Sequence, residues 1–123
     1  MRYLVLGAFI CVAAMCSGKL VALADDYTLL SPDEIKSEII GKQQTGRNSS
    51  GSYWFNTAKA DGTIDVRWGG GQDSGKWHFE GTAYCTEYVK VRNGAKQCFG
   101  IGRVSGGYAY IVNDKISDTF TVK

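Results

Sequence analysis

A single histidine, His78, decides whether this chain could carry acid–base chemistry. A hydrolytic triad needs an imidazole beside a nucleophile, and His78 stands within Lys76-Trp77-His78-Phe79-Glu80. If this run is a strand, Trp77 and Phe79 take the inner face and His78 points to solvent. Neither a G-x-S-x-G elbow nor a phosphate loop in the right context accompanies it. We therefore predict no catalytic residue, and a small hydrolase that uses His78 stays as an alternative.

The carboxylates and the potential metal ligands of the chain give little support for catalysis or for metal binding. Asp61, Asp65 and Glu80 could meet across neighbouring strands and support glycoside chemistry, but alternating charges on a strand usually form a solvated face. Residues 61–65 lack the spaced oxygen ligands of a calcium loop, and one histidine is too few for a zinc site beside two cysteines. We predict no metal and no cofactor.

Aromatic residues remain as the candidates for binding, because the chain holds three tryptophans and seven tyrosines. About half of them must form the core. Exposed aromatics beside glycine-rich loops are common in sites that recognise sugars, peptides and proteins. The candidate ligand-binding residues are Tyr53, Phe55, Trp68, Tyr84 and Tyr88. A solvated tyrosine face with no ligand is the simpler alternative.

The first 24 residues have the pattern of a cleaved signal peptide. Arg2 supplies the positive start, residues 3–18 are mostly apolar, and Ala22-Leu23-Ala24 is an A-x-A cleavage site. Cys16 raises the alternative of a lipoprotein, but Met15 stands where lipidation needs a small residue. We predict cleavage after Ala24, a periplasmic or secreted location, and no stable membrane insertion after cleavage.

Removal of the signal changes both the charge and the cysteine count. The signal carries two of the 14 basic residues, so residues 25–123 keep 12 basic and 12 acidic side chains. This balance shows no basic patch for nucleic acid or anionic lipid. Of the four cysteines, only Cys85 and Cys98 remain, and an even pair outside the cytosol predicts one disulfide.

The elements that must position these residues begin with one helix. Ser31-Pro32-Asp33-Glu34 is a helix start, with a serine cap, an early proline and a glutamate three residues later. Ile35, Ile39 and Ile40 follow at helical spacing before Gly41. We predict a helix over residues 32–40 that plugs or flanks a sheet, followed by a polar loop over residues 41–52.

The rest of the chain alternates apolar and polar residues between turn signals. Residues 63–68 place Ile64, Val66 and Trp68 on one face, and residues 82–92 form a long fourth strand. We predict a mainly β (α+β) fold: one antiparallel small barrel or sandwich of about six strands with a short N-terminal helix. Residues 25–123 form this single disulfide-containing domain.

The two cysteines conflict with an ideal hairpin. Asn93-Gly94 favours a two-residue turn, which would leave Cys85 and Cys98 four residues out of register. A disulfide needs Cα atoms within about 7 Å. We therefore expect a longer loop, a bulge or a strong twist, with Gly100 or Gly102 as possible bulge sites.

A resemblance rests on Gly75-Lys76-Trp77, Tyr84-Cys85 and Cys98-Phe99, preceded by Gly51-x-Tyr53 and an Asp61-Gly62 turn. These motifs resemble a family of small exported proteobacterial proteins of unknown function, over about residues 31–110. The resemblance implies an extracytoplasmic β-rich protein and transfers no functional residue. Thr86-Glu87-Tyr88 departs from it, since a tryptophan often follows the first cysteine there.

Together these features predict an exported, non-enzymatic binding or interaction module of the bacterial envelope, with an unknown protein or glycan partner. The alternative from another class is an inhibitor of an envelope or host hydrolase. In that case a loop such as residues 69–74 would enter the cleft of the hydrolase.

Overall fold

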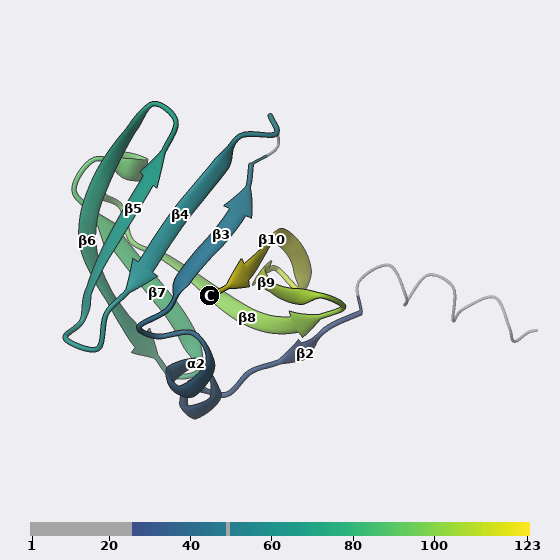
Figure 1. Ribbon diagram of the computed structural model, residues 1–123. Coiled ribbons are helices and arrows are strands. Elements are labelled where there is room, and N and C mark those ends of the chain that lie inside the picture. The colour runs from purple at the N-terminus through teal and green to yellow at the C-terminus, as the bar shows by residue number, and fades with distance from the viewer. Residues whose placement is uncertain (1–25, 49) are drawn as a thin grey trace, which may run out of the picture.

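The computed structural model describes residues 26–48 and 50–123, so the predicted signal peptide and its cleavage site lie outside the described residues (Figure 1). In the described part the regular elements are β2 (Thr28–Leu29), α2 (Pro32–Glu38), β3 (Gln43–Arg47), β4 (Tyr53–Ala58), β5 (Thr63–Trp68), β6 (Gly71–Glu80), β7 (Ala83–Tyr88), the 3₁₀ turn η2 (Val91–Gly94), β8 (Gln97–Val104), β9 (Gly107–Val112) and β10 (Lys115–Val122).

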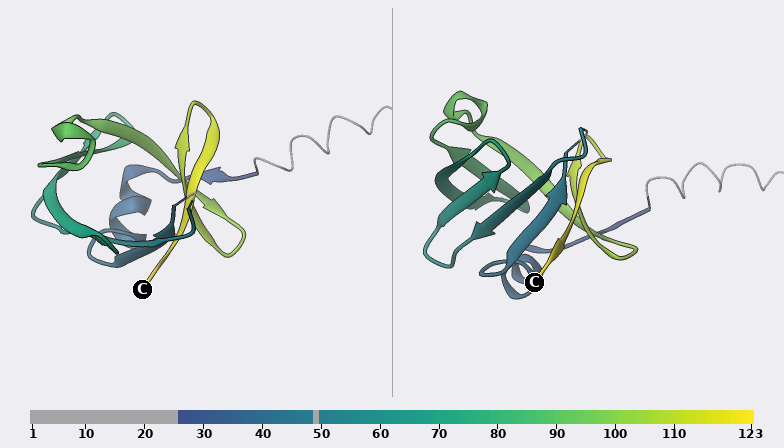
Figure 2. Two further views of the ribbon diagram at one scale, coloured as in Figure 1. Left: turned by 90° about the horizontal axis from the view of Figure 1, so that it is seen from above. Right: turned by 45° about the horizontal axis from the view of Figure 1, so that its top comes forward.

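The strands β3 to β10 form a closed barrel. Each of them pairs antiparallel with the next one along the chain, and β10 returns to pair with β3. The ring that results is visible from above in Figure 2. The predicted antiparallel barrel is confirmed, and the sandwich alternative is wrong because eight strands close on themselves and leave no second sheet.

The predicted number of about six strands is too low. The main omission is β3, which lies in the stretch predicted as a polar loop and reads Gln-Gln-Thr-Gly-Arg. Its polar residues gave no strand signal, yet Gln44 is fully buried and Gly46 lies against the Trp54 ring, where an added Cβ would meet the ring at 2.3 Å. Barrel closure, which needs a strand between β4 and β10, overrides the local pattern.

Helix α2 closes one end of the barrel, the lower end in Figure 1. Its predicted capping box is present: Glu34 N–H donates to Ser31 Oγ at 3.2 Å, and Ser31 N–H donates to Glu34 Oε1 at 2.8 Å. Ile35 in the helix and Ile39 at its C-terminal cap are fully buried. Glu38 ends the helix, two residues before the predicted end.

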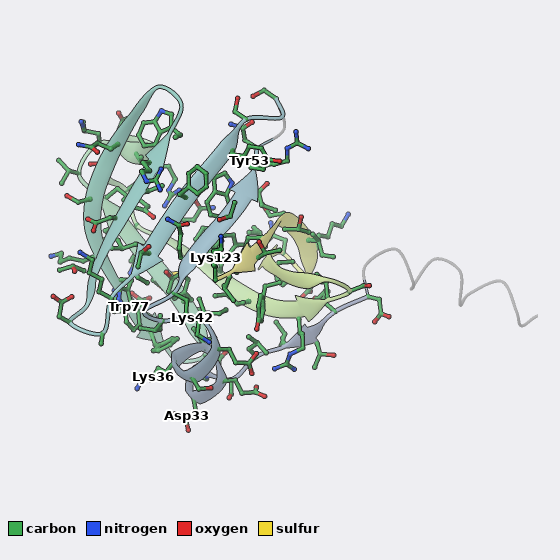
Figure 3. The ribbon with its side chains drawn as sticks, viewed as in Figure 1. Asp33, Lys36, Lys42, Tyr53, Trp77 and Lys123 are labelled. Atoms are coloured by element: carbon green, nitrogen blue, oxygen red, sulfur yellow. A yellow bond between two sulfur atoms is a disulfide. The ribbon has the colours of Figure 1, made fainter. Side chains whose placement is uncertain are left out.

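The hydrophobic core extends from this helix along the interior of the barrel. Trp77 and Phe79 face inward as predicted, with ring centroids 5.4 Å apart, and Trp77 also packs against Tyr84 at 5.9 Å. The indole N–H of Trp77 donates to the Lys59 carbonyl oxygen at 2.7 Å. Figure 3 shows Trp77 toward the α2 end and Tyr53 toward the opposite end.

The disulfide is present, and the loop between its strands explains the register. The predicted long strand over residues 82–92 is wrong, because β7 ends at Tyr88 and η2 extends the connection to β8. Arg92 and Asn93 both have a φ of 55°, so no two-residue hairpin forms at Asn93-Gly94. The longer loop brings Cys85 directly opposite Cys98, with Cα atoms 4.0 Å apart.

Residues 69–74 do not form the loop that the inhibitor alternative uses. Strand β6 begins at Gly71 and pairs with β5 from there, so only Gly69 and Gly70 remain as the turn. The first two glycines end β5, and the third already belongs to β6, where it pairs with Trp68. In the described part of the chain, none of the helices has the length and apolar character needed to cross a bilayer.

Candidate functional site

The end of the barrel opposite α2 holds a cavity of about 400 Å³. Its lining includes Asn48 just after β3, Trp68 at the end of β5 and Arg92 in η2, and the ends of β3 and β5 lie toward the top in Figure 1. Its walls contain five aromatic rings, namely Trp54, Trp68, Tyr88, Phe99 and Tyr110, and its polar residues include Asn48, Asn56, Thr86, Arg92, Gln97, Ser117 and Asp118. Aromatic walls with a few convergent polar groups are typical of small-molecule sites.

The aromatic walls follow from strand parity. Trp54 on β4 and Tyr110 on β9 both face inward, and their rings stack at 6.1 Å. Phe99 on β8 packs against Tyr110 at 4.7 Å. Tyr110 donates its hydroxyl to Gln44 Oε1, and its full burial raises its pKa well above the ordinary value. These rings form a fixed, neutral lining.

Asn56 and Tyr88 form a buried polar pair within the cavity. Asn56 is 7% exposed, and its Nδ2 donates to the Tyr88 hydroxyl at 2.8 Å. Burial raises the pKa of Tyr88 to about 12, so this hydroxyl stays protonated at neutral pH. Asn56 Oδ1 is buried and accepts no hydrogen bond from the described residues. A buried acceptor without a donor costs free energy.

Arg92 reaches the cavity from η2. Its guanidinium donates to Thr86 Oγ1 at 2.9 Å and lies 5.6 Å from the centroid of the Tyr88 ring. The backbone at Arg92 is left-handed, a conformation that non-glycine residues rarely adopt and that is common at binding sites. The loop therefore holds a cation over the mouth at some conformational cost.

Asp73 anchors that loop. Its carboxylate accepts N–H groups from Val91 at 2.8 Å, Lys90 at 2.7 Å and Ser74 at 2.9 Å. Burial by itself would raise the pKa of Asp73, but the three backbone donors outweigh it and hold the pKa below its usual value. An ionised Asp73 thus fixes Lys90 and Val91, the two residues that precede Arg92.

The predicted binding residues fall into three places. Trp68 and Tyr88 line the cavity, whereas Tyr84 is fully buried in the core and stacks on Tyr110 at 6.4 Å. Tyr53 and Phe55 lie on the outer face of β4, because they have the opposite parity to Trp54. The structure therefore brings only two of the five together at the cavity.

Tyr53 and Phe55 form a separate outer strip. Arg47 lies 4.8 Å from the Tyr53 ring centroid, and Arg67 lies 4.5 Å from that of Phe55. Phe55 and Arg67 also line a hollow of about 640 Å³ on the outside of β4, β5 and β6. Although this hollow is larger than the cavity, it contains one aromatic ring and, among described residues, no buried polar atom that lacks a partner. The cavity is therefore the stronger site.

Sequence reasoning missed the polar residues of the cavity. Asn56 follows three aromatic residues at the inward parity of β4, and a buried asparagine within an apolar strand face was the signal available. The predicted strand over residues 82–92 includes Arg92, and Asp118 lies in the part of the chain where apolar and polar residues alternate. Neither the predicted strand nor the alternation places these two residues at the mouth of the cavity. Their positions depend on η2 and on a bulge in β10.

His78 lies outside the barrel and does not line the cavity. Its Nε2 is 2.8 Å from Glu80 Oε2, and Lys96 Nζ is 2.5 Å from the same oxygen. His78, Glu80 and Cys85 bring potential metal ligands within 4.8 Å of one another, but the Cys85 sulfur is bonded to Cys98 and is not a thiolate. This cluster is a surface charge network beside the disulfide.

The three carboxylates considered for glycoside chemistry are engaged separately. Asp61 accepts from Thr63 N–H at 3.0 Å and so stabilises a turn, Asp65 pairs with Lys59 at 2.8 Å, and Glu80 belongs to the network with His78. None of the three lines the cavity.

Comparison of the chain with models of known families, with curated proteins and with solved structures finds no match. The similarity to small exported proteobacterial proteins therefore stays a prediction. The candidate site rests on geometry alone.

Proposed function

We propose that this protein is an exported, non-enzymatic binding module of the bacterial envelope that holds a small molecule in the open end of its barrel. The observation that carries the proposal is the aromatic cavity of about 400 Å³ with the hydrogen-bonded pair of Asn56 and Tyr88 in its wall. Antiparallel barrels of eight strands are wide enough to enclose one small ligand. The Cys85–Cys98 disulfide supports an extracytoplasmic location.

The hydrolase and inhibitor alternatives have less support. His78 meets Glu80 on the outer face, where no cavity-lining residue accompanies it. The inhibitor alternative requires a protruding loop, whereas Gly71 and the residues after it pair with β5. A small-molecule site accounts for more of the polar and aromatic residues at the open end than either alternative.

The proposal can be tested with 1-anilinonaphthalene-8-sulfonate, an aromatic anion whose emission rises in a dry apolar site. We expect enhanced emission with one equivalent bound to the mature protein. Gln97→Trp, which places a ring at the mouth from β8, should reduce that emission at least fivefold. Glu87→Trp on β7 is the matched control, because Glu87 faces away from the cavity, and it should bind as the wild type does.

A further variant separates the cavity from the outer strip. Tyr53→Ser removes the exposed ring on β4, which is 52% exposed, and should leave the emission unchanged. If Tyr53→Ser abolishes the emission while Gln97→Trp retains it, the outer strip is the site and the cavity proposal fails.

A further inference from the structure

The mouth of the cavity presents one cation and one anion that do not pair with each other. Arg92 and Asp118 both line it. Within residues 26–48 and 50–123 neither side chain takes part in an ion pair. Both charges act on Tyr110, whose pKa burial raises, Asp118 raises further and Arg92 lowers. Because both residues line the cavity, both charges lie at the same opening.

A bulge in β10 turns Asp118 inward. Ile116 pairs with Ile111 on β9, but the next pair joins Asp118 to Tyr110, so Ser117 is an extra residue. Without that residue Ser117 would lie opposite Tyr110, and Asp118 would face outward with Ala109. Directly opposed residues of an antiparallel pair share a face, and Tyr110 faces the cavity. The same bulge also turns Phe120 into the core.

Arg92 is held on the other side of the mouth. Its backbone has a φ of 55°, and the N–H groups of Lys90 and Val91 just before it donate to Asp73. Its guanidinium donates to Thr86 on β7. Around the barrel, β8 and β9 separate β7 from β10. At about 4.8 Å between neighbouring strands, β7 and β10 lie roughly 14 Å apart along the wall. Aromatic rings line the intervening surface.

We infer that the cavity binds a dipolar small molecule: an aromatic or apolar body with an anionic group at one end and a cationic group at the other. This inference rests on the proposed function of the cavity. Arg92 would receive the anion, since a guanidinium matches a carboxylate or phosphate. Asp118 receives the cation. A molecule with both charges on one carbon can meet only one of the two residues.

Isothermal titration calorimetry with four related compounds tests this inference. They are 4-(2-aminoethyl)benzoate with a charge at each end, 4-ethylbenzoate with the anion alone, 4-ethylbenzylamine with the cation alone, and phenylalanine with both charges at one end. We expect the first to bind at least tenfold more tightly than any other. N-acetylglucosamine is added as a hydroxyl-rich neutral probe and should bind more weakly than the first compound.

Charge-removing variants assign each end. Arg92→Met should reduce the affinity for 4-(2-aminoethyl)benzoate to the affinity that the wild type has for 4-ethylbenzylamine, which carries the cation alone. Asp118→Asn should reduce it to the affinity that the wild type has for 4-ethylbenzoate, which carries the anion alone. Arg47→Met and Asp65→Asn remove charges from the outer face and should change nothing, and circular dichroism verifies folding of every variant.

Equal affinity for the dipolar compound and one singly charged compound would overturn the inference, as would tighter binding of N-acetylglucosamine or no binding of the dipolar compound. These results would leave the cavity proposal intact if Gln97→Trp still lowers the emission of the naphthalene probe. Loss of that difference between Gln97→Trp and wild type would instead reject the cavity itself.

Discussion

The two ends of the barrel differ in how completely their polar groups are satisfied. At the closed end α2 covers the core, its capping box is complete, and Glu38 accepts from Arg103 at 2.6 Å and from the Tyr108 hydroxyl at 2.9 Å. At the open end Asn56 Oδ1 is buried without a donor among the described residues, and deeper in the interior Gln44 Nε2 and Tyr84 OH also lack a partner. Arg92 has a left-handed backbone there, and Asp118 has turned inward at a bulge.

This difference indicates that the closed end contributes mainly to the stability of the fold and that the open end serves binding. Folding alone favours filled cores and paired polar groups. Strained backbone and unpartnered polar atoms persist where the rest of the fold is stable enough to maintain them, and they concentrate at binding sites. Substitutions at the closed end should therefore change stability, and substitutions at the open end should change binding.

The largest effect is expected at the closed end from Trp77→Ala. The substitution removes a ring that packs on Phe79 and Tyr84 and donates to the Lys59 carbonyl. We expect a loss of about 3 kcal/mol in the free energy of unfolding, measured by urea denaturation. Loss below about 1 kcal/mol would mean that this end is not the stable half of the barrel.

Removal of the disulfide by Cys85→Ala with Cys98→Ala should lower the free energy of unfolding by about 3 kcal/mol. The reason is that the bond closes a loop between two cysteines that are 13 positions apart in the sequence. The disulfide lies on the outer face, so the naphthalene probe should bind the folded double variant as it binds the wild type. Mass spectrometry without reductant should detect no free thiol in the mature wild type. A free thiol at either position would contradict the structure.

A paired change at the open end should be nearly neutral for stability. Asn56→Leu with Tyr88→Phe replaces both partners of one buried hydrogen bond and removes the unpartnered oxygen. Replacing both partners with apolar groups is expected to change the unfolding free energy by less than about 1 kcal/mol. Affinity for 4-(2-aminoethyl)benzoate should nevertheless fall. A loss of several kcal/mol would show that this end is as important for stability as the closed one.

The smallest effect is a pH dependence at Asp73. Its folded pKa lies below the unfolded value of about 3.9, so its contribution to stability is present above that value and is lost as the pH falls toward the folded pKa. The stability difference between wild type and Asp73→Asn should therefore be larger at pH 7 than at pH 3.

Asp65→Asn is the control for this pH dependence. Asp65 pairs only with the exposed Lys59 across the outer surface, so its replacement should matter little at either pH. Urea denaturation of the three proteins at both pH values measures the effect. An equal difference at pH 7 and pH 3 for Asp73→Asn would contradict the proposed anchoring of η2.

Local signals were strong where side chains follow a simple period. The capping box at Ser31, the inward parity of Trp77 and the outward parity of His78 were all predictable, because each depends on residues within a few positions. Strand β3 was not predictable from its polar residues. Its burial depends on closure between β4 and β10, which are distant in the sequence.

The sequence by itself determined the β class, the N-terminal helix, the cysteine pair and the alternation that separates inner from outer rings. These depend on local periodicity and on residue chemistry. Only the tertiary structure decided that eight strands close into a barrel with one open end. It also decided that Arg92 and Asp118 join Asn56 in lining that end, because a 3₁₀ turn and a one-residue bulge set the directions of Arg92 and Asp118. Such features shift the register between distant segments, and one residue of shift reverses which face a side chain takes.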